Sequence, residues 1–217
     1  MEQTKLTITN NSTEEILIWV TLGAVKGCIQ NVQDLPFISN GSNLQGSFTL
    51  PPQKSISYTP PSGVGLNGNL AFDTPPSNCP PENFPTGVNL AEFMLNNDFQ
   101  TGQPQETIDI SGVAGTNALI EFSMNGGGTW NAGSTVPYVT NFKNGAIGEN
   151  KGKVGVFPYG CEDCNISGTP VCPSNPPYGA PSKLTPQDEA ICNVQRNAAE
   201  AGGTVTISFN GYVDAPV

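Results

Sequence analysis

Three short runs between residues 89 and 124 alternate apolar and polar side chains. In the first run, Ala91, Phe93 and Leu95 share one side while Glu92 takes the other. Asp109 in the second run and Glu121 in the third also fall on the polar side. Such alternation is typical of half-buried strands, because successive side chains of a strand point to opposite faces of its sheet. The segment therefore predicts three strands, each with one outward carboxylate.

The rest of the chain keeps this rhythm of short runs between turn residues. With 25 Gly, 20 Pro and only 12% charged residues, we expect frequent turns and few long helices. Lys5–Asn10 and Ile16–Leu22 predict a hairpin joined by the polar turn NNSTE at 10–14. The further runs that predict strands are Lys5–Asn10, Ile16–Leu22, Ser47–Leu50, Lys54–Tyr58, Leu66–Phe72, Thr135–Phe142, Lys153–Phe157 and Thr204–Asn210.

These runs predict an all-β protein with one core. A chain of 217 residues can bury a full sandwich core, and neither an internal repeat nor a linker divides it. We expect a single domain over 1–217, with the sandwich formed by about 1–158 and 204–217. The intervening stretch, about 159–203, loses the periodicity and predicts an excursion of loops and one short helix.

That helix has clear signals at both ends. Thr185 is an N-cap candidate, Pro186 stands at the first helical position, and acidic residues follow in the first turn. Gly202 and Gly203 would end it. The pattern predicts a helix from about Pro186 to Ala201.

The net charge of −10, with a single arginine at position 196, argues against binding to nucleic acid. No run reaches the ~18 apolar residues that a membrane helix needs. The first residues lack the basic and apolar regions of a signal peptide, so we expect that such a signal was either removed or never present. We expect no cofactor and no metal.

Six cysteines in a loop-rich chain favour disulfides and a secreted protein. The alternative is a zinc site formed by the last four cysteines, although no histidine is available to share the ligation. A bridge between Cys28 and Cys79 would tether two long loops. The disulfide candidates are Cys28, Cys79, Cys161, Cys164, Cys172 and Cys192.

Several of these segments resemble the thaumatin-like family, the pathogenesis-related and osmotin-like β sandwiches. NLAEFMLNN, TIDISGVAGTN and ALIEFS are similar to three consecutive pieces of the family's central region. LTITNNSTEEILIWV and VTISFNG are similar to its opening and closing strands. The family joins these two ends by a disulfide, whereas this chain has Asn11 and Ser12 at one neighbourhood and Asn210 at the other. The chain resembles a divergent member.

The resemblance implies a flattened β sandwich, a disulfide-containing excursion and an acidic cleft between them. It also implies a secreted, defence-related or cell-wall-related protein that binds or slowly hydrolyses β-1,3-glucans. The family's cleft glutamate falls on Glu92 and its first aspartate on Asp109. Its second aspartate falls on Ala114, and its arginine has no match, because Arg196 lies in the predicted helix. Asp188 could be its last aspartate, but the helix start explains that residue better.

Hydrolysis of a glycosidic bond needs two carboxyl groups, one acid and one nucleophile or base. Glu92 and Asp109 are the catalytic candidates if their strands are neighbours, and Glu121, on the same polar face, would raise a neighbouring pKa through like charge. Loss of the family's arginine and second aspartate weakens this hypothesis, so enzymatic activity is not our first expectation. Without histidine, Ser-His-Asp and Cys-His catalysis are excluded.

Aromatic residues could stack on sugar rings. Tyr159 and Tyr178, in the excursion beside the implied cleft, are the substrate-binding candidates together with Glu121. Trp19 lies inside a dense apolar run, which predicts a core position.

Two classes of function follow from the sequence. The first is a glycan-binding module, with a polysaccharide or cell-wall glycan as partner and weak endo-β-1,3-glucanase activity as a variant. The second is a non-catalytic structural or assembly protein that uses the sandwich as a scaffold, for which self-assembly stays open.

Overall fold

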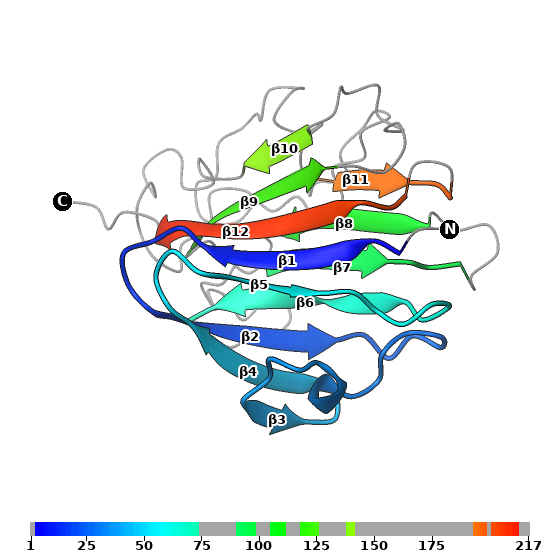
Figure 1. The fold of residues 1–217 in the computed structure, drawn as a ribbon, viewed down its shortest axis with the longest axis horizontal. Helices are drawn as coiled ribbons and strands as arrows, with labels where there is room; N and C mark the ends of the chain where they lie inside the picture. Colours follow the sequence, from blue (N-terminus) through cyan, green and yellow to red (C-terminus); the bar gives the residue numbers. More distant parts are fainter. Residues whose placement is uncertain are drawn as a thin grey trace, which may run out of the picture.

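A computed structural model describes residues 3–73, 90–98, 105–111, 118–125, 138–141, 193–198 and 201–212. Within these ranges the chain forms strands in two sheets and one 3-10 helix, η1 (Val32–Asp34) (Figure 1). The all-β prediction is confirmed. None of the helices in the described ranges is long and apolar enough to cross a membrane.

The strands divide between two sheets that lie face to face (Figure 1). Sheet A, in order across the sheet, contains β10 (Tyr138–Asn141), β9 (Ala118–Asn125), β12 (Thr204–Tyr212), β1 (Lys5–Asn10) and β5 (Ser55–Tyr58). Sheet B contains β11 (Asn193–Arg196), β8 (Glu106–Ser111), β7 (Leu90–Leu95), β6 (Leu66–Phe72), β2 (Ile16–Leu22), β4 (Gln45–Leu50) and β3 (Asn40–Ser42).

One apolar core fills the space between the sheets. It collects the inward positions of strands from both sheets, as the alternation predicted. Phe72 of β6 stacks on Phe209 of β12 across the core, with ring centroids 5.1 Å apart. Both rings are fully buried, and burial of such a side chain contributes about 1.5–3 kcal/mol. The sandwich is therefore held by cross-sheet packing between segments far apart in sequence.

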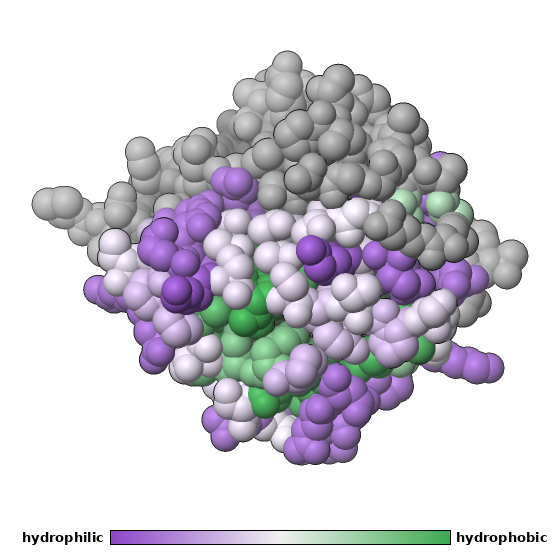
Figure 2. Space-filling view, viewed as in Figure 1, coloured by the Kyte–Doolittle hydropathy of each residue, from purple (hydrophilic) through white to green (hydrophobic). Residues whose placement is uncertain are grey.

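Sheet B extends beyond the edge strand β5 of sheet A. The segment after η1 covers part of this overhang, because Phe37 packs edge-on against Phe48 and Tyr58, at centroid distances of 4.9 and 6.3 Å. Figure 2 shows apolar surface gathered below β5, next to the paler surface over β1 and β12. The open side of the sandwich is thus partly closed by a loop rather than by a further strand.

The predicted hairpin between the first two strands is wrong. β1 pairs with β12 and β5 in sheet A, whereas β2 pairs with β4 and β6 in sheet B. The buried side chain of Asn10 organises the crossing, since its Nδ2 donates to the carbonyls of Glu14 (2.7 Å) and Leu50 (2.9 Å). β1 and β2 are each apolar on one side. With one strand in each sheet, the apolar sides of both strands face the same core.

The predicted helix at 186–201 is also wrong where the structure describes it. β11 pairs antiparallel with β8, so that Val194 lies opposite Ile108 and Arg196 opposite Glu106. Arg196 and Glu106 are each 1% exposed and form an ion pair on the inward side. A buried charge is costly unless it is paired, so the partner on β8 overrides the helical capping signals.

The ion pair belongs to a polar cluster that joins the sheets at one end. Asn96 exchanges hydrogen bonds with the backbone of Thr4, at 2.8 and 3.1 Å, and Arg196 Nη1 donates to the carbonyl of Gly202 at 3.1 Å. The Gly202 amide donates to Thr4 Oγ1 at 2.8 Å. Burial raises the pKa of the Glu106 carboxyl, against the opposing effect of the Arg196 charge.

The cysteine prediction receives one correction. Cys28 is a buried free thiol, and its Sγ lies 3.9 Å from the sulfur of Met94, so the predicted bridge to Cys79 is absent. Desolvation raises the pKa of this thiol to about 11. The backbone around Cys28 is held instead by pairing with Gly65. The other five cysteines predicted to form disulfides and the two tyrosines predicted to bind substrate lie outside the described residues. They are Cys79, Cys161, Cys164, Cys172, Cys192, Tyr159 and Tyr178.

Candidate functional site

The two carboxylates singled out in the sequence lie on neighbouring strands. β7 and β8 are antiparallel neighbours in sheet B, and Glu92 lies directly opposite Asp109 in their register. Cross-strand partners project to the same face, with Cβ atoms about 4.5–5.5 Å apart. Glu92 is half-buried on the outer face of sheet B. Glu92 and Asp109 were catalytic candidates only if their strands were neighbours, and β7 and β8 are neighbours.

Polar residues continue this row across sheet B. Asn69 of β6 lies opposite Glu92, and Thr21 of β2 lies opposite Asn69. Asn193 of β11 lies opposite Asp109. In the register, Thr21, Asn69, Glu92, Asp109 and Asn193 therefore fall on one line across five adjacent strands, which we call the polar row.

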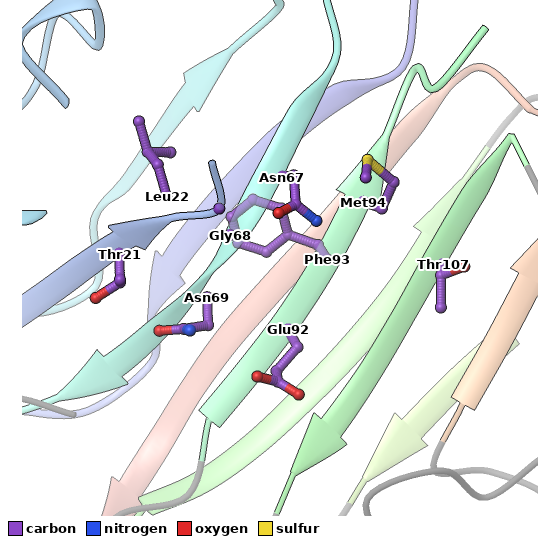
Figure 3. A pocket seen from close by; sticks show the side chains of 10 residues that line it. Thr21, Leu22, Asn67, Gly68, Asn69, Glu92, Phe93, Met94 and Thr107 are labelled. Atoms are coloured by element: carbon purple, nitrogen blue, oxygen red, sulfur yellow. The ribbon is translucent and has the colours of Figure 1, made fainter. Parts of the chain in front are cut away.

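A hollow of about 400 Å³ lies over part of the polar row. Figure 3 shows Thr21, Asn69, Glu92 and Thr107 around it, contributed by β2, β6, β7 and β8. Its lining residues are Thr21, Leu22, Gly23, Asn67, Gly68, Asn69, Glu92, Phe93, Met94 and Thr107. The hollow thus offers several hydrogen-bonding groups together with a somewhat larger apolar surface.

Close backbone approach shapes one end of this hollow. The amide of Gly23 donates to the carbonyl of Asn67 at 3.0 Å, and a Cβ on Gly23 would lie 1.7 Å from Asn67 Oδ1. A side chain there would displace the Asn67 amide. Met94 of β7 lies opposite Asn67, and its sulfur contacts the sulfur of Cys28. The Asn67 amide therefore lies against Gly23, and Met94 is its cross-strand partner.

The two amides of this site, Asn67 and Asn69, were not among the site residues predicted from the sequence. Asn67 and Asn69 occupy the polar positions of the alternating run that became β6, two residues apart and on the same face. Their spacing was visible in the sequence, but polar residues on a strand are ordinarily solvated surface. Only their place beside Glu92 distinguishes them.

Trp19 also lies on this outer face, so the prediction that it belongs to the core is wrong. The run of β2 alternates strictly, and Ile18 and Val20 on either side take the buried positions. Trp19 is half-buried, and its indole N–H donates to the carbonyl of Asp73 at 3.3 Å.

Glu121 does not share a face with Glu92, which corrects a further prediction. It lies on β9 in sheet A, between the inward residues Ile120 and Phe122, so it projects from the opposite side of the sandwich. Alternation tells which side of its own strand a residue occupies, but not to which sheet that strand belongs.

The neighbours of Glu121 connect the two ends of the chain. Asn210 Nδ2 donates to a Glu121 carboxylate oxygen at 3.4 Å, and Asn11 Nδ2 donates to Asn210 Oδ1 at 2.8 Å. The two neighbourhoods in which the resemblance implied a lost disulfide are thus adjacent. A hydrogen bond between two asparagines joins them.

The chemistry of the hollow is that of hydrogen bonding. Amides donate and accept, hydroxyls do both, and an ionised carboxylate accepts. Among the described residues, no group of three or more histidine, cysteine, aspartate or glutamate side chains could hold a metal ion. The arrangement suits a ligand rich in hydroxyl groups.

Comparison with known proteins gives structural neighbours only. No protein-family model and no curated protein matches the chain. Among solved structures, the thaumatin-like xylanase inhibitor TLXI is 15% identical with a TM-score of 0.40, over 94% of this chain and 97% of that chain. The protein elicitor MoHrip2 from Magnaporthe oryzae is 9% identical with a TM-score of 0.38, over 95% of this chain and 98% of that chain.

Proposed function

We propose that this is a secreted protein that binds a neutral cell-wall polysaccharide, with β-1,3-glucan as first candidate, on the outer face of sheet B. The observation that carries the proposal is the polar row, in which Thr21, Asn69 and Glu92 line one hollow from three adjacent strands. The choice of β-1,3-glucan as ligand, and of a defence-related or cell-wall-related role, rests on the resemblance to thaumatin-like proteins.

The groups in the hollow favour a neutral polyol over an anion. Glu92 lines it, and the register places Asp109 beside Glu92. A phosphate or an acidic sugar would meet these carboxylates and the net charge of −10. A hydroxyl group can donate to a carboxylate and accept from an amide, so it can satisfy both groups at once.

The test is retention on insoluble β-1,3-glucan. We expect wild type to be retained and Glu92→Gln to bind about tenfold more weakly, because a hydrogen bond to a charged group contributes about 1.5–3 kcal/mol. Asn69→Ala should lose less, about fivefold, since it removes neutral bonds.

Glu121→Gln is the matched control, because it makes the same change on the opposite face and should bind as wild type does. No retention of wild type would reject the proposal for this glucan and favour the scaffold alternative. Equal losses in Glu92→Gln and Glu121→Gln would reject the outer face of sheet B as the site.

The register of β7 and β8 favours one second candidate, a weak endo-β-1,3-glucanase. Two carboxylates on directly opposed positions can approach the ~5–5.5 Å separation of a retaining pair. Release of reducing ends by wild type, abolished in both Glu92→Gln and Asp109→Asn but not in Glu121→Gln, would support hydrolysis. Tight retention of wild type with no product would leave a binding protein.

A further inference from the structure

Trp19 has an unusual setting for a large aromatic residue on a strand. It projects from the outer face of sheet B, and its cross-strand neighbours on that face are Ser47 of β4 and Ala71 of β6. Both are small, and both are buried, with 5% and 0% of their surface exposed, although they face outward. Trp19 lies between them in the register, so its indole stands between two small side chains.

Small neighbours on both sides leave room for the indole to lean over the sheet. Its N–H donates to the carbonyl of Asp73, just beyond the end of β6, so the ring extends from β2 toward that end of β6. Trp19 is half-buried, so part of the indole is available to solvent.

Trp19 adjoins the polar row, although it does not line the hollow itself. Trp19 and Thr21 are two residues apart on β2 and share the outer face, and Thr21 lines the hollow. Glu92 lies two strands away across β6 and one level further along. With about 4.8 Å between strands and about 3.4 Å per residue, the Cα atoms of Trp19 and Glu92 are about 12 Å apart.

We propose that Trp19 is a stacking subsite for a pyranose ring, and that it extends the site at Glu92 so that the preferred ligand is an oligosaccharide. The apolar C–H face of one sugar lies on the indole, while the hydroxyls of another reach Asn69 and Glu92. A single sugar cannot contact both ends of a site of this length. This inference rests on the proposed function and assigns the length of its ligand.

The test compares short and long ligands. β-1,3-linked disaccharide and hexasaccharide of glucose are titrated into wild type, Trp19→Leu and Trp19→Phe. We expect Trp19→Leu to bind hexasaccharide about tenfold more weakly, with disaccharide affinity nearly unchanged. Trp19→Phe, which keeps a ring, should lose less. A role of Trp19 in stability alone would lower both affinities together.

A spectroscopic measurement keeps the inference falsifiable if Trp19→Leu does not fold. The chain has two tryptophans, so Trp130→Phe leaves Trp19 as the only indole. Hexasaccharide should shift its fluorescence in that variant, and about tenfold more hexasaccharide should be needed for the same shift when Glu92→Gln is added.

The outcomes separate the two proposals. A Trp19→Leu variant that binds hexasaccharide as wild type does, while Glu92→Gln binds weakly, overturns the Trp19 subsite and leaves the proposed function in place. Absence of binding to every ligand by folded wild type overturns both. Unchanged Trp19 fluorescence at saturating hexasaccharide overturns the subsite alone.

Discussion

The two outer faces of the sandwich differ in how their polar groups are satisfied. On sheet A, hydroxyls of adjacent strands pair with each other, with Thr7 and Ser57 oxygens 2.9 Å apart and Thr9 and Ser55 oxygens 2.9 Å apart. Figure 2 shows the resulting surface as pale, near-neutral side chains over β1. On sheet B, the outer positions around the hollow carry amides, hydroxyls and the carboxylate of Glu92.

The contrast is clearest between two glutamates. Glu121 on sheet A accepts a hydrogen bond from Asn210, which itself accepts one from Asn11. Glu92 on sheet B lies opposite Asp109, a like charge. Like charges directly opposite each other destabilise a sheet. The proposed site on sheet B therefore includes two like charges at opposed strand positions, whereas the glutamate on sheet A belongs to a chain of hydrogen-bonded amides.

The largest expected effect comes from strengthening sheet A. Asn11→Cys/Asn210→Cys places two cysteines where the side chains are already hydrogen-bonded, 199 residues apart in sequence. A bridge across so long a loop stabilises by up to about 5 kcal/mol in the chain-entropy model. Denaturant unfolding of the oxidised double variant, against each single variant, measures the gain.

Glucan retention by the bridged variant should equal that of wild type, because the bridge lies on the face opposite the hollow. An oxidised double variant no more stable than the single variants would show that the two asparagine positions are not in register for a bridge.

The next largest effect concerns the buried ion pair between Arg196 and Glu106. Arg196→Met leaves the Glu106 carboxylate buried without its cation, and we expect about 3–5 kcal/mol of lost stability by urea unfolding. Glu106→Leu/Arg196→Met removes both charges and should recover most of that loss. Lys5→Met, an exposed cation on sheet A, should change stability by less than about 0.5 kcal/mol.

A loss under about 1 kcal/mol in Arg196→Met would contradict this account of the buried pair. It would also remove the reason given for a strand rather than a helix at 193–196.

The thiol beside the hollow gives a kinetic prediction. Burial raises the pKa of Cys28 from 9.0 to about 11, and the thiolate is the reactive form. At pH 8 native Cys28 should therefore carry about 100-fold less thiolate than an ordinary cysteine, and its alkylation should accelerate as the pH rises toward 11. Peptide mass spectrometry of iodoacetamide-treated protein, native and in urea, measures the ratio.

Met94→Ala should speed the native reaction, because it opens the contact with Cys28 Sγ. Equal alkylation rates of Cys28 in native and unfolded protein would contradict the burial of this thiol. Failure to alkylate Cys28 in urea until a reductant is added would instead restore the bridge predicted from the sequence.

The smallest effect is expected on the hydroxyl pairs of sheet A. Thr7→Val/Ser57→Ala removes one cross-strand pair at an exposed position, which should cost less than about 1 kcal/mol. Glucan retention should not change. A variant that folds normally but loses retention would assign the binding surface to sheet A and reverse the comparison of the two faces.

Several elements could be predicted from the sequence because they depend on local pattern. β6 was predicted at the same residues that the structure gives it, and the inward residues of β7 are those that alternation selected. The sequence predicted that Glu92 and Asp109 lie on the outward sides of their strands. It could not show that they lie opposite each other, because that requires the two strands to be neighbours.

Other features could not be predicted because they depend on distant parts of the chain. The helix signals before Gly202 are local, whereas β11 exists through its pairing with β8 and the partnership of Arg196 with Glu106. Trp19 was misplaced because a dense apolar run obscured the alternation within it.

The sequence by itself determined an all-β chain, the positions of most strands and the side of each strand that faces the core. Those properties follow from a period of two residues and from turn residues, which act over a few positions. Only the tertiary structure decided which strands share a sheet. That choice separates Glu121 from Glu92 and brings Asn69 beside Glu92, because strand partners are selected by packing between segments far apart in the chain.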